Sequence, residues 1–425
     1  MYYDIVIVGG GAGGLELAAR LGRWFGREQG AQKVLLIDRA SVHIWKPTLH
    51  EVAVGTLNTQ QEGLSYQSLG RRNHFSFMRA QLQQLHPETH QLTLAPVCDV
   101  QGEFIIAERT IEFGKCVLAL GSGSNFFGTS GSEHAYVLEN LEDAERFYNQ
   151  LSHLFSWAEY SDHHTLNVSI VGGGATGVEL AAELREAYRL FAAERATPAF
   201  QLNITLIEAG ARILATLPEK MSQNAAQILQ SKQVTVLTST KVLALHRDHI
   251  TTSAGELAAG AIVWAAGIKA AETNRDFGLT VNALNQFIVD EQLRTSAADI
   301  YAIGDCAACL WRDGKNVPAR AQAAHQQAFF LFKQLRAIAQ NKAFRKRYRY
   351  RDFGSLIALG GKDNIGNLIP NLLKRHIFIE GIIAKYMYLL LHLAHHQLLL
   401  GYGKTFLLVL ARFAQNRLSG RLKWH

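Results

Sequence analysis

Almost continuous apolar runs that stop at a glycine cluster begin two similar stretches of the chain. Residues 4–8 and 168–171 are rich in β-branched side chains and do not alternate between apolar and polar, which is typical of parallel strands covered on both faces. A helical period follows each run, from about Leu15 to Phe25 and again through about Phe191. These patterns predict strand–helix–strand units, and therefore parallel sheets with right-handed crossovers.

Further strand-like runs predict that both sheets continue beyond these units. One long helix is also expected at residues 319–339, and a basic run at 345–351 marks the start of a separate C-terminal region. The further runs are 34–37, 116–120, 204–207, 262–266 and 300–303.

The two units are copies of one another. Residues 8–21 read VGGGAGGLELAARL and residues 171–184 read VGGGATGVELAAEL, so 11 of 14 positions are identical. Repetition of this kind indicates that one structural unit is used twice. The predicted fold is α/β, with two Rossmann-like dinucleotide-binding domains in tandem.

Each copy carries the spacing G-x-G-x-x-G between its strand and its helix. In such loops the first glycine permits the tight turn, the second lets a pyrophosphate approach the backbone, and the third lets the helix pack closely. The helix N-terminus then offers free N–H groups to the phosphates. The glycines are Gly9, Gly11 and Gly14 in the first copy and Gly172, Gly174 and Gly177 in the second.

An acidic residue ends the second strand of each unit, Asp38 in the first and Glu208 in the second. An acid at this place accepts hydrogen bonds from an adenosine ribose. A carboxylate there also repels a 2′-phosphate, so Glu208 favours NADH over NADPH, although Arg212 lies close behind it in the sequence. With both units complete, two dinucleotide sites are predicted.

Length and composition fit a protein of two or three domains. The chain has 425 residues, of which 48% are hydrophobic and 19% charged, so it can build large cores. Its four cysteines are too few for a disulfide framework, and no secretory signal precedes the first strand. Both features favour the cytoplasm. Cys306 and Cys309 form C-x-x-C without a second pair of ligands, so no metal site is expected.

The net charge of +7 resides in the C-terminal tail. Residues 371–425 contain eight basic residues and the single acid Glu380. A basic, apolar tail on a neutral body indicates an anionic surface as partner. Nucleic acid is not expected, because the many Leu and Ile residues have no role on a phosphate backbone.

The tail also contains a stretch without any Lys, Arg, Asp or Glu, at residues 386–403. Its length is close to the minimum for a membrane span, but it includes His392, His395 and His396, which are costly at the centre of a bilayer. We therefore expect amphipathic helices lying in the membrane interface. The alternative is a helix pair docked on the body or in a dimer interface.

The motifs together resemble a known group, the bacterial type II NADH:quinone oxidoreductases, which are flavoproteins with two dinucleotide-binding domains. The resemblance runs essentially end to end, and the string AQAAHQ and the basic apolar tail are its most diagnostic parts. The segments that carry it, besides the glycine loops and the tail, are WKPTLHEVA at 45–53, ALGS at 119–122, AAG at 265–267, IGDCA at 303–307 and AQAAHQ at 321–326.

The resemblance implies a domain order and an activity. Residues 1–128 and 287–345 would form a discontinuous FAD-binding domain, 129–286 an inserted NADH-binding domain, and 346–425 the membrane-association region. The enzyme would pass a hydride from NADH to FAD and then two electrons to a quinone, ubiquinone or menaquinone. It would act as a non-proton-pumping respiratory enzyme, peripheral on the cytoplasmic face of the cell membrane. A homodimer is compatible with this interpretation.

The resemblance also assigns roles to individual residues. Glu179, Gln322 and Gln326 are the catalytic candidates. For FAD they are Gly9, Gly11, Ala12, Gly13, Gly14, Asp38, Lys46, Gly121, Gly304, Asp305 and Gln322. For NADH they are Gly172, Gly174, Thr176, Gly177, Glu179, Glu208 and Gly267. For the quinone they are Gln322, Gln326 and Lys385. Gln322 and Gln326 lie four residues apart and so share a helix face, whereas Gln327 is expected to point elsewhere.

Three other functions remain open from the sequence. Sulfide:quinone oxidoreductases share the architecture but use cysteines beside the flavin, a task for which Cys306 and Cys309 are the candidates. A soluble reductase of an iron–sulfur protein would lack the membrane tail. A nucleotide-occupied redox sensor would hold a flavin that NADH does not reduce.

Overall fold

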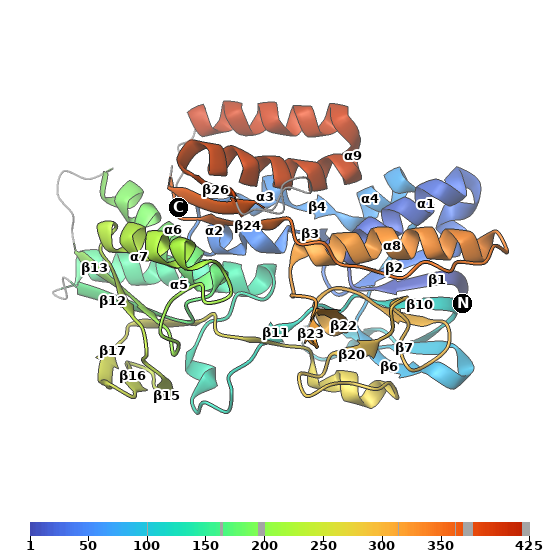
Figure 1. The fold of residues 1–425 in the computed structure, drawn as a ribbon, viewed down its shortest axis with the longest axis horizontal. Helices are drawn as coiled ribbons and strands as arrows, with labels where there is room; N and C mark the ends of the chain where they lie inside the picture. Colours follow the sequence, from blue (N-terminus) through green and yellow to red (C-terminus); the bar gives the residue numbers. More distant parts are fainter. Residues whose placement is uncertain are drawn as a thin grey trace.

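The computed structural model describes residues 1–99, 101–161, 165–193, 200–312, 314–361, 363–368 and 377–418. Its first domain is built on a seven-stranded sheet in the order β5-β2-β1-β10-β7-β6, with β21 also paired to β10 (Figure 1). β1, β2, β5, β10 and β21 run parallel, and β7 and β6 are antiparallel additions at one edge. The strands are β1 Tyr2–Val8, β2 Val34–Asp38, β5 Ser76–Arg79, β6 Leu82–His86, β7 Gln91–Leu94, β10 Arg109–Leu118 and β21 Ile300–Ala302.

Two long helices pack together on this sheet, α1 (Ala12–Lys33) and α8 (Ala321–Ala339). α1 begins directly after the glycine loop and is kinked at Gly26, whose φ is 81°. Both predicted helices are therefore confirmed. α4 (Tyr66–Asn73) also packs against α1.

The second domain repeats the arrangement on a smaller scale. Its parallel sheet has the order β14-β13-β12-β18. The elements are α5 Leu141–Tyr160, β12 Thr165–Val171, α6 Ala175–Ala193, β13 Gln201–Ile207, α7 Glu219–Ser231, β14 Val234–Leu237 and β18 Ala261–Trp264. A three-stranded meander follows β14, made of β15 Val242–Leu245, β16 His249–Thr252 and β17 Gly255–Ala258.

Two crossing segments connect the domains and pair with each other. β11 (Gly123–Ser124) and β19 (Ile268–Lys269) form an antiparallel bridge. The short helix α2 (Leu49–Ala53) belongs to the first domain by sequence but packs on α5 and α6 of the second. Residues of α2 consequently lie where the domains meet.

The C-terminal region adds a third layer across both domains (Figure 1). It contains an antiparallel sheet that the sequence pattern did not predict, made of β24 Gly354–Ala358, β25 Asn364–Leu368 and β26 Ile377–Glu380. α9 (Gly381–Leu418) follows and reverses at Gly401, whose φ is 72°, so its two halves lie antiparallel. In the part of the chain that the structure describes, no helix is long and apolar enough to cross a membrane.

Several of the tail's basic residues fall outside the described part of the chain, so the fold does not test the membrane role proposed for them. They are Lys374, Arg375, Arg421, Lys423 and the side chain of Arg417.

Candidate active site

The two glycine loops have the same backbone shape. Gly9 has a φ of 106° and Gly172 a φ of 112°, a region that residues with a side chain rarely adopt. A Cβ on Gly9 would lie 2.2 Å from the carbonyl oxygen of Ala119, and one on Gly172 would lie 2.7 Å from Cα of Ala266. Each loop is thus pressed against the strand beside it, and no other residue fits.

The second glycine of each motif lies at a position with free space around it, which we call open, and the third lies at a crowded position, which we call closed. A Cβ at Gly11 or Gly174 would meet nothing within 4 Å. At Gly14 and Gly177 it would lie 1.9 and 2.0 Å from the carbonyl oxygens of the first glycines. The open position bares the backbone at a helix N-terminus and the closed one holds the helix close, as a pyrophosphate cradle requires.

Asp38, the last residue of β2, and Glu208, the first residue after β13, hold these loops in the same way. Asp38 accepts hydrogen bonds from the N–H groups of Gly10 (2.6 Å) and Ala40 (2.8 Å). Glu208 accepts from Gly173 (2.7 Å) and Gly210 (2.6 Å). Both predicted ribose ligands therefore lie beside their glycine loops.

The carbonyl oxygen of Gly10 has two buried partners that the sequence analysis missed. The hydroxyl of Tyr66 donates to it at 2.8 Å, and Nδ1 of His43 lies 3.1 Å away. Because a carbonyl only accepts, His43 carries its proton on Nδ1. Nε2 of His43 lies 2.9 Å from Nε2 of His395, which joins the first loop to α9.

Three of the predicted FAD residues lie close together beyond β10 and β21. Ser122 donates to Asp305 at 3.1 Å, and Lys46 donates to the carbonyl oxygen of Ser122 at 3.1 Å. Gly304 has a φ of 75°, and its N–H donates at 2.7 Å to the side-chain oxygen of Gln327. Gln327, which is 1% exposed, is a further residue that the sequence analysis passed over.

The remaining predicted nucleotide residues lie at or near the loops. Gly13 is packed against Ile303 and Ala324, and Gly121 has a φ of 72° beside open space. Ala12 is the first residue of α1, and the exposed Thr176 lies in the first turn of α6. Gly267 has a φ of 68° and faces the ring of Phe127.

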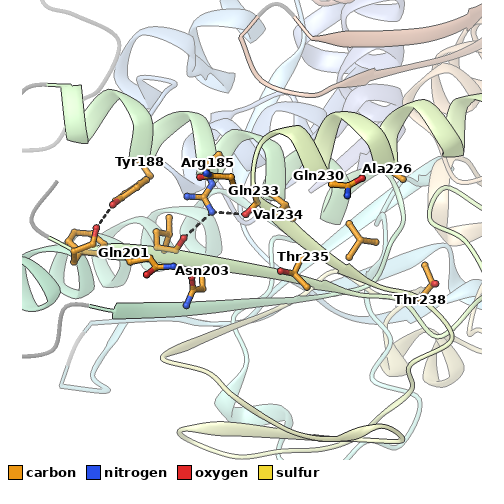
Figure 2. A pocket seen from close by; sticks show the side chains of 13 residues that line it. Arg185, Tyr188, Gln201, Asn203, Ala226, Gln230, Gln233, Val234, Thr235 and Thr238 are labelled. Atoms are coloured by element: carbon orange, nitrogen blue, oxygen red, sulfur yellow. Dashed lines mark hydrogen bonds between the residues drawn. The ribbon is translucent and has the colours of Figure 1, made fainter. Parts of the chain in front are cut away.

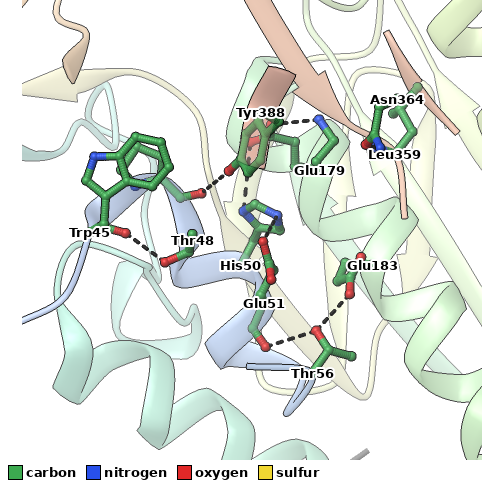
Figure 3. A network of polar contacts seen from close by, with 12 residues as sticks. Trp45, Thr48, His50, Glu51, Thr56, Glu179, Glu183, Leu359, Asn364 and Tyr388 are labelled. Carbon is green, nitrogen blue, oxygen red and sulfur yellow. Dashed lines mark hydrogen bonds and ion pairs between the residues drawn. The ribbon is translucent and has the colours of Figure 1, made fainter. Parts of the chain in front are cut away.

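Glu179 lies where the two domains and the C-terminal sheet meet, and Figure 3 shows the side chains that converge there. It is 8% exposed, and Oε1 accepts a hydrogen bond from the N–H of Ala358 at 3.0 Å. Nδ1 of the buried His50 lies 3.8 Å from its other oxygen. Burial, more than the neighbouring Glu183, raises the pKa of Glu179 to about 8.

A second acid from α2 completes this group, and sequence reasoning had no signal for it. Burial, followed by the negative charges of Glu183 and Glu179, raises the pKa of Glu51 to about 8. Burial lowers the pKa of His50 to about 4, so that ring is neutral. We call Glu51, Glu179 and Glu183 the acid cluster. At neutral pH it carries protons on groups that are normally ionised.

Tyr388 of α9 covers the acid cluster (Figure 3) and donates to the carbonyl oxygen of Pro47 at 3.2 Å. Burial raises its pKa well above the usual value, and the cluster's charges add to that shift. Lys385, one turn earlier, donates to the carbonyl oxygen of Gly361 at 2.8 Å. The predicted quinone residue Lys385 and the catalytic candidate Glu179 therefore lie on elements that meet at this cluster.

Gln322 and Gln326 share one face of α8, and both amides bond the segment of residues 351–354, which leads into β24. Gln322 donates to the carbonyl oxygen of Gly354 (2.9 Å) and accepts from the N–H of Phe353 (3.2 Å). Gln326 bonds both backbone groups of Arg351, at 2.8 and 3.0 Å. That these amides face the flavin and the quinone stays a prediction.

The cysteines do not provide a reactive thiol pair. Cys306 and Cys309 are 0% and 3% exposed. Burial raises their pKa to about 12 and about 11, which keeps the thiols protonated and unreactive at neutral pH. The sulfide:quinone alternative loses the residues on which it rested.

Figure 2 shows the side chains that line a cavity in the second domain. Its volume is about 1100 Å³, and no residue of either glycine loop lines it. Among the described residues, Arg185 is the only charged one that lines it, and its guanidinium donates to the carbonyl oxygens of Leu202 and Gln233 at 2.9 and 2.8 Å. None of the predicted site residues lines this cavity, so its size does not mark it as the active site.

Two glycine cradles on two parallel sheets, each closed by an acid, define an α/β oxidoreductase fold with paired dinucleotide sites. The family model of pyridine nucleotide-disulphide oxidoreductases matches residues 3–328. A type II NADH:quinone oxidoreductase of Haemophilus influenzae is 37% identical over 99% of this chain and 100% of its own length. The chain belongs to that family, and within it to the type II NADH:quinone oxidoreductases.

More distant relatives agree. A type II NADH:quinone oxidoreductase of Staphylococcus aureus is 24% identical over 89% of this chain and 93% of its own length. The structure of NDH2 from Plasmodium falciparum in complex with NADH superposes with a TM-score of 0.83 at 19% identity, covering 99% of both chains. A sulfide:quinone oxidoreductase of Aquifex aeolicus reaches 0.74 at 16% identity, over 98% and 95%. At these identities the two structures establish the fold.

Proposed function

We propose that this protein oxidises NADH and reduces a quinone at a membrane surface, with FAD as its bound cofactor. The overall reaction is NADH + H⁺ + quinone → NAD⁺ + quinol. The observation that carries the proposal is the pair of glycine cradles, each with an open position at Gly11 or Gly174. A bound FAD supplies the two-electron carrier between the two substrates.

The first cradle, with Asp38, Gly121 and Asp305, is proposed to hold FAD, and Lys46 to lie along its ring. The second, with Glu208, Thr176 and Gly267, is proposed to bind NADH. This assignment makes residues 1–128 and 287–345 the FAD domain and 129–286 the NADH domain. The basis for both assignments is the family's domain order together with the matching loop geometry.

The acid cluster is proposed to hold protons for the quinone. Quinol formation consumes two protons, and the carboxyls of the buried Glu179 and the partly buried Glu51 have a pKa raised to about 8. A general acid works best when its pKa is near the operating pH. Glu179 also orients substrate, while Lys385, Gln322 and Gln326 are proposed to border the quinone.

The membrane role is proposed from the distribution of side chains on α9. A helix on the surface of a water-soluble protein turns its polar side chains outward and its apolar ones inward, and α9 does the opposite. Its histidines turn inward, with His392 and His396 only 5% and 2% exposed. Large apolar side chains face outward. They are Ile382, Ile383, Tyr386, Leu390, Leu391, Tyr402, Phe406, Leu407 and Leu410. An exposed apolar surface of this kind marks a contact with lipid or protein. The cytoplasmic face and a homodimer stay predictions.

The activity is tested by anaerobic titration of the purified, flavin-loaded protein. NADH is expected to bleach the flavin absorption and a quinone to restore it. Sulfide, added to a fresh oxidised sample, is expected to have no effect. A flavin that NADH leaves oxidised would favour the redox sensor, and bleaching by sulfide would favour the sulfide:quinone alternative.

The membrane surface is tested by sedimentation with vesicles of neutral and anionic lipid. Full-length chains carrying Leu390→Glu and Leu407→Glu should lose most of their binding, whereas Leu243→Glu should keep it. Leu243 is a matched control because it is 49% exposed on β15 of the second domain. Equal binding of all three chains would contradict the assignment of α9.

A further inference from the structure

Two imidazoles and one carboxylate form a buried group between α3 (Thr59–Glu62) and α9. His392 and His396 lie one turn apart on α9, and Glu62 ends α3. Their exposed fractions are 5%, 2% and 7%. One potential ligand atom of each lies within 4.8 Å of the other two. No part of the proposed electron transfer uses this group.

The ring of His396 is oriented as a metal ligand would be. Nδ1 lies 3.1 Å from the carbonyl oxygen of His392, and because a carbonyl only accepts, the proton sits on Nδ1. Nε2 is left with a lone pair, and this buried atom has no hydrogen-bond partner. A backbone carbonyl that fixes the tautomer from behind is the usual support of a metal-binding histidine.

His392 supplies a second buried imidazole. Its ring stacks on Trp45 with centroids 4.8 Å apart. Nε2 lies 4.0 Å from Oε2 of Glu62, which is too far for a hydrogen bond. Ligand atoms around one tetrahedral zinc ion are ~3.3 Å apart, as bonds of ~2.0 Å require. Small side-chain rotations would bring the three atoms to that spacing.

A competitor for the carboxylate is already present. The guanidinium of Arg412, from the second half of α9, forms an ion pair with Oε2 of Glu62. The side chain of Arg412 is 19% exposed, but its Nε and Nη2 atoms are buried, so leaving Glu62 requires the whole guanidinium to move outward. A buried carboxylate needs one positive partner, and a cation between the three ligands would supply it in place of Arg412.

We propose that Glu62, His392 and His396 form a binding site for a divalent transition cation of the zinc type, with water in the remaining position. Imidazole and carboxylate together suit Zn²⁺. The cation and Arg412 alternate as the partner of Glu62, so binding releases the second half of α9 from this contact. The site is new relative to the sequence analysis, which expected no metal because it considered only the cysteines. Residues more than 300 positions apart supply it.

The test is titration of the full-length, flavin-loaded protein with ZnSO₄ against a chromogenic chelator, with Trp fluorescence as a second signal because Trp45 stacks on His392. One Zn²⁺ is expected per chain. His396→Gln and Glu62→Gln should weaken binding by roughly tenfold or more. His249→Gln is the matched control, since His249 stacks on His246 in a surface pair 4.1 Å apart that could bind zinc adventitiously.

Arg412→Gln is expected to strengthen zinc binding, which a misfolded chain would not do. Removing the competitor should tighten zinc binding by roughly tenfold and make the melting temperature rise on addition of Zn²⁺ by more than in the parent protein. Unchanged binding in His396→Gln, or loss of the signal in His249→Gln instead, would overturn the proposal. So would an Arg412→Gln chain, with its flavin intact, that binds zinc no more tightly than the parent.

Discussion

The two copies of the glycine-loop unit share a sequence but surround the same acid with opposite charges. Glu16 in α1 and Glu179 in α6 occupy equivalent positions and are both buried. Glu16 accepts from Nε of Arg20 at 2.8 Å and lies 2.6 Å from Nδ1 of His325. Glu179 has Glu183 at the place of Arg20 and no basic side chain among the contacts above except the neutral His50.

The divergent position thus gives one acid a positive partner and the other a negative neighbour. In the first copy the acid is neutralised by its own helix, so it can fix α1 to α8 through His325. In the second copy a like charge one turn away and burial both oppose ionisation, and the pKa of Glu179 rises to about 8. A buried acid with a perturbed pKa, close to where two domains meet, is typical of a functional group.

The largest effect is expected from making the same substitution in both loops. Gly9→Ala should abolish FAD binding, because its Cβ would lie 2.2 Å from the carbonyl oxygen of Ala119 at a φ of 106°. Gly172→Ala should leave FAD bound and raise the KM for NADH by roughly tenfold or more. Flavin absorption of the purified proteins and NADH kinetics measure the two outcomes.

The control for both loops is Gly102→Ala, a positive-φ glycine on the surface with open space around it. It should keep flavin and NADH kinetics. If Gly172→Ala instead loses flavin while Gly9→Ala keeps it, the assignment of the two cradles is reversed.

The second-largest effect is a loss of stability, expected when the positive charge beside Glu16 is replaced by the negative charge that lies beside Glu179. Arg20→Glu would place a like charge beside Glu16, which is 1% exposed. Breaking a buried ion pair costs about 3 kcal/mol or more, and His325 remains as the one compensating partner. The free energy of unfolding, from denaturant titration, should fall by that amount. Arg27→Glu, on the same helix, should change it far less.

The reverse exchange should change how stability depends on pH. Glu179 and Glu51 have a folded-state pKa raised to about 8, so the folded chain holds protons that the unfolded chain releases near its usual pKa of ~4.5. Stability is therefore highest below that value and falls as the pH rises towards 8, by about 1.4 kcal/mol per pH unit for each of the two carboxyls. Glu183→Arg would restore the pairing seen at Glu16 and flatten this fall.

The measurement is the denaturation midpoint at pH 5, 6, 7 and 8 with flavin content held constant. Glu183→Gln removes the like charge without adding the opposite one, and its amide oxygen can still accept the hydrogen bond that Thr56 now donates at 2.7 Å. It should flatten the profile by a smaller amount. A slope that both variants leave unchanged would mean that Glu183 does not set the ionisation of Glu179.

Local patterns were sufficient for the parts of this molecule that depend on neighbours in sequence. The glycine loops, the strands before and after them and the helix α8 follow from spacing and periodicity, and each is present. The sheet of β24, β25 and β26 was not predicted, because NIGNL and its neighbours carry no clear alternation and draw their pairing from each other.

The polar contacts of the site were harder to predict from the sequence, because they join segments that are far apart along the chain. Glu51 enters the site only because α2 packs against the second domain, and nothing in residues 45–53 alone indicates that. Gln327 was set aside although it bonds Gly304, since helical spacing shows which residues share a face but not what that face contacts. The same holds for Glu62 and His392, which fold together from opposite ends of the chain.

The smallest effect is expected from substituting Asp38 and Glu208, the acids that accept hydrogen bonds from the two glycine loops. Glu208→Gln keeps the size of the side chain, but its single amide oxygen can accept from only one of the N–H groups of Gly173 and Gly210, which now bond separate carboxylate oxygens at 2.7 and 2.6 Å. The substitution therefore removes one hydrogen bond to the loop as well as the charge beside the ribose. The KM for NADH should rise by only a fewfold, while NADPH, whose 2′-phosphate a carboxylate repels, should gain by a comparable factor.

Asp38→Asn is the counterpart in the first copy, where the bound nucleotide has no 2′-phosphate to discriminate. It should weaken FAD retention slightly and leave the ratio of NADH to NADPH activity unchanged. If Glu208→Gln also leaves that ratio unchanged, Glu208 holds its loop as Asp38 does and something else selects the nucleotide. Arg212 would then be the next residue to change, since its guanidinium, now bonded to the carbonyl oxygens of Leu214, Ala215 and Leu217, is the positive group that follows the acid in sequence.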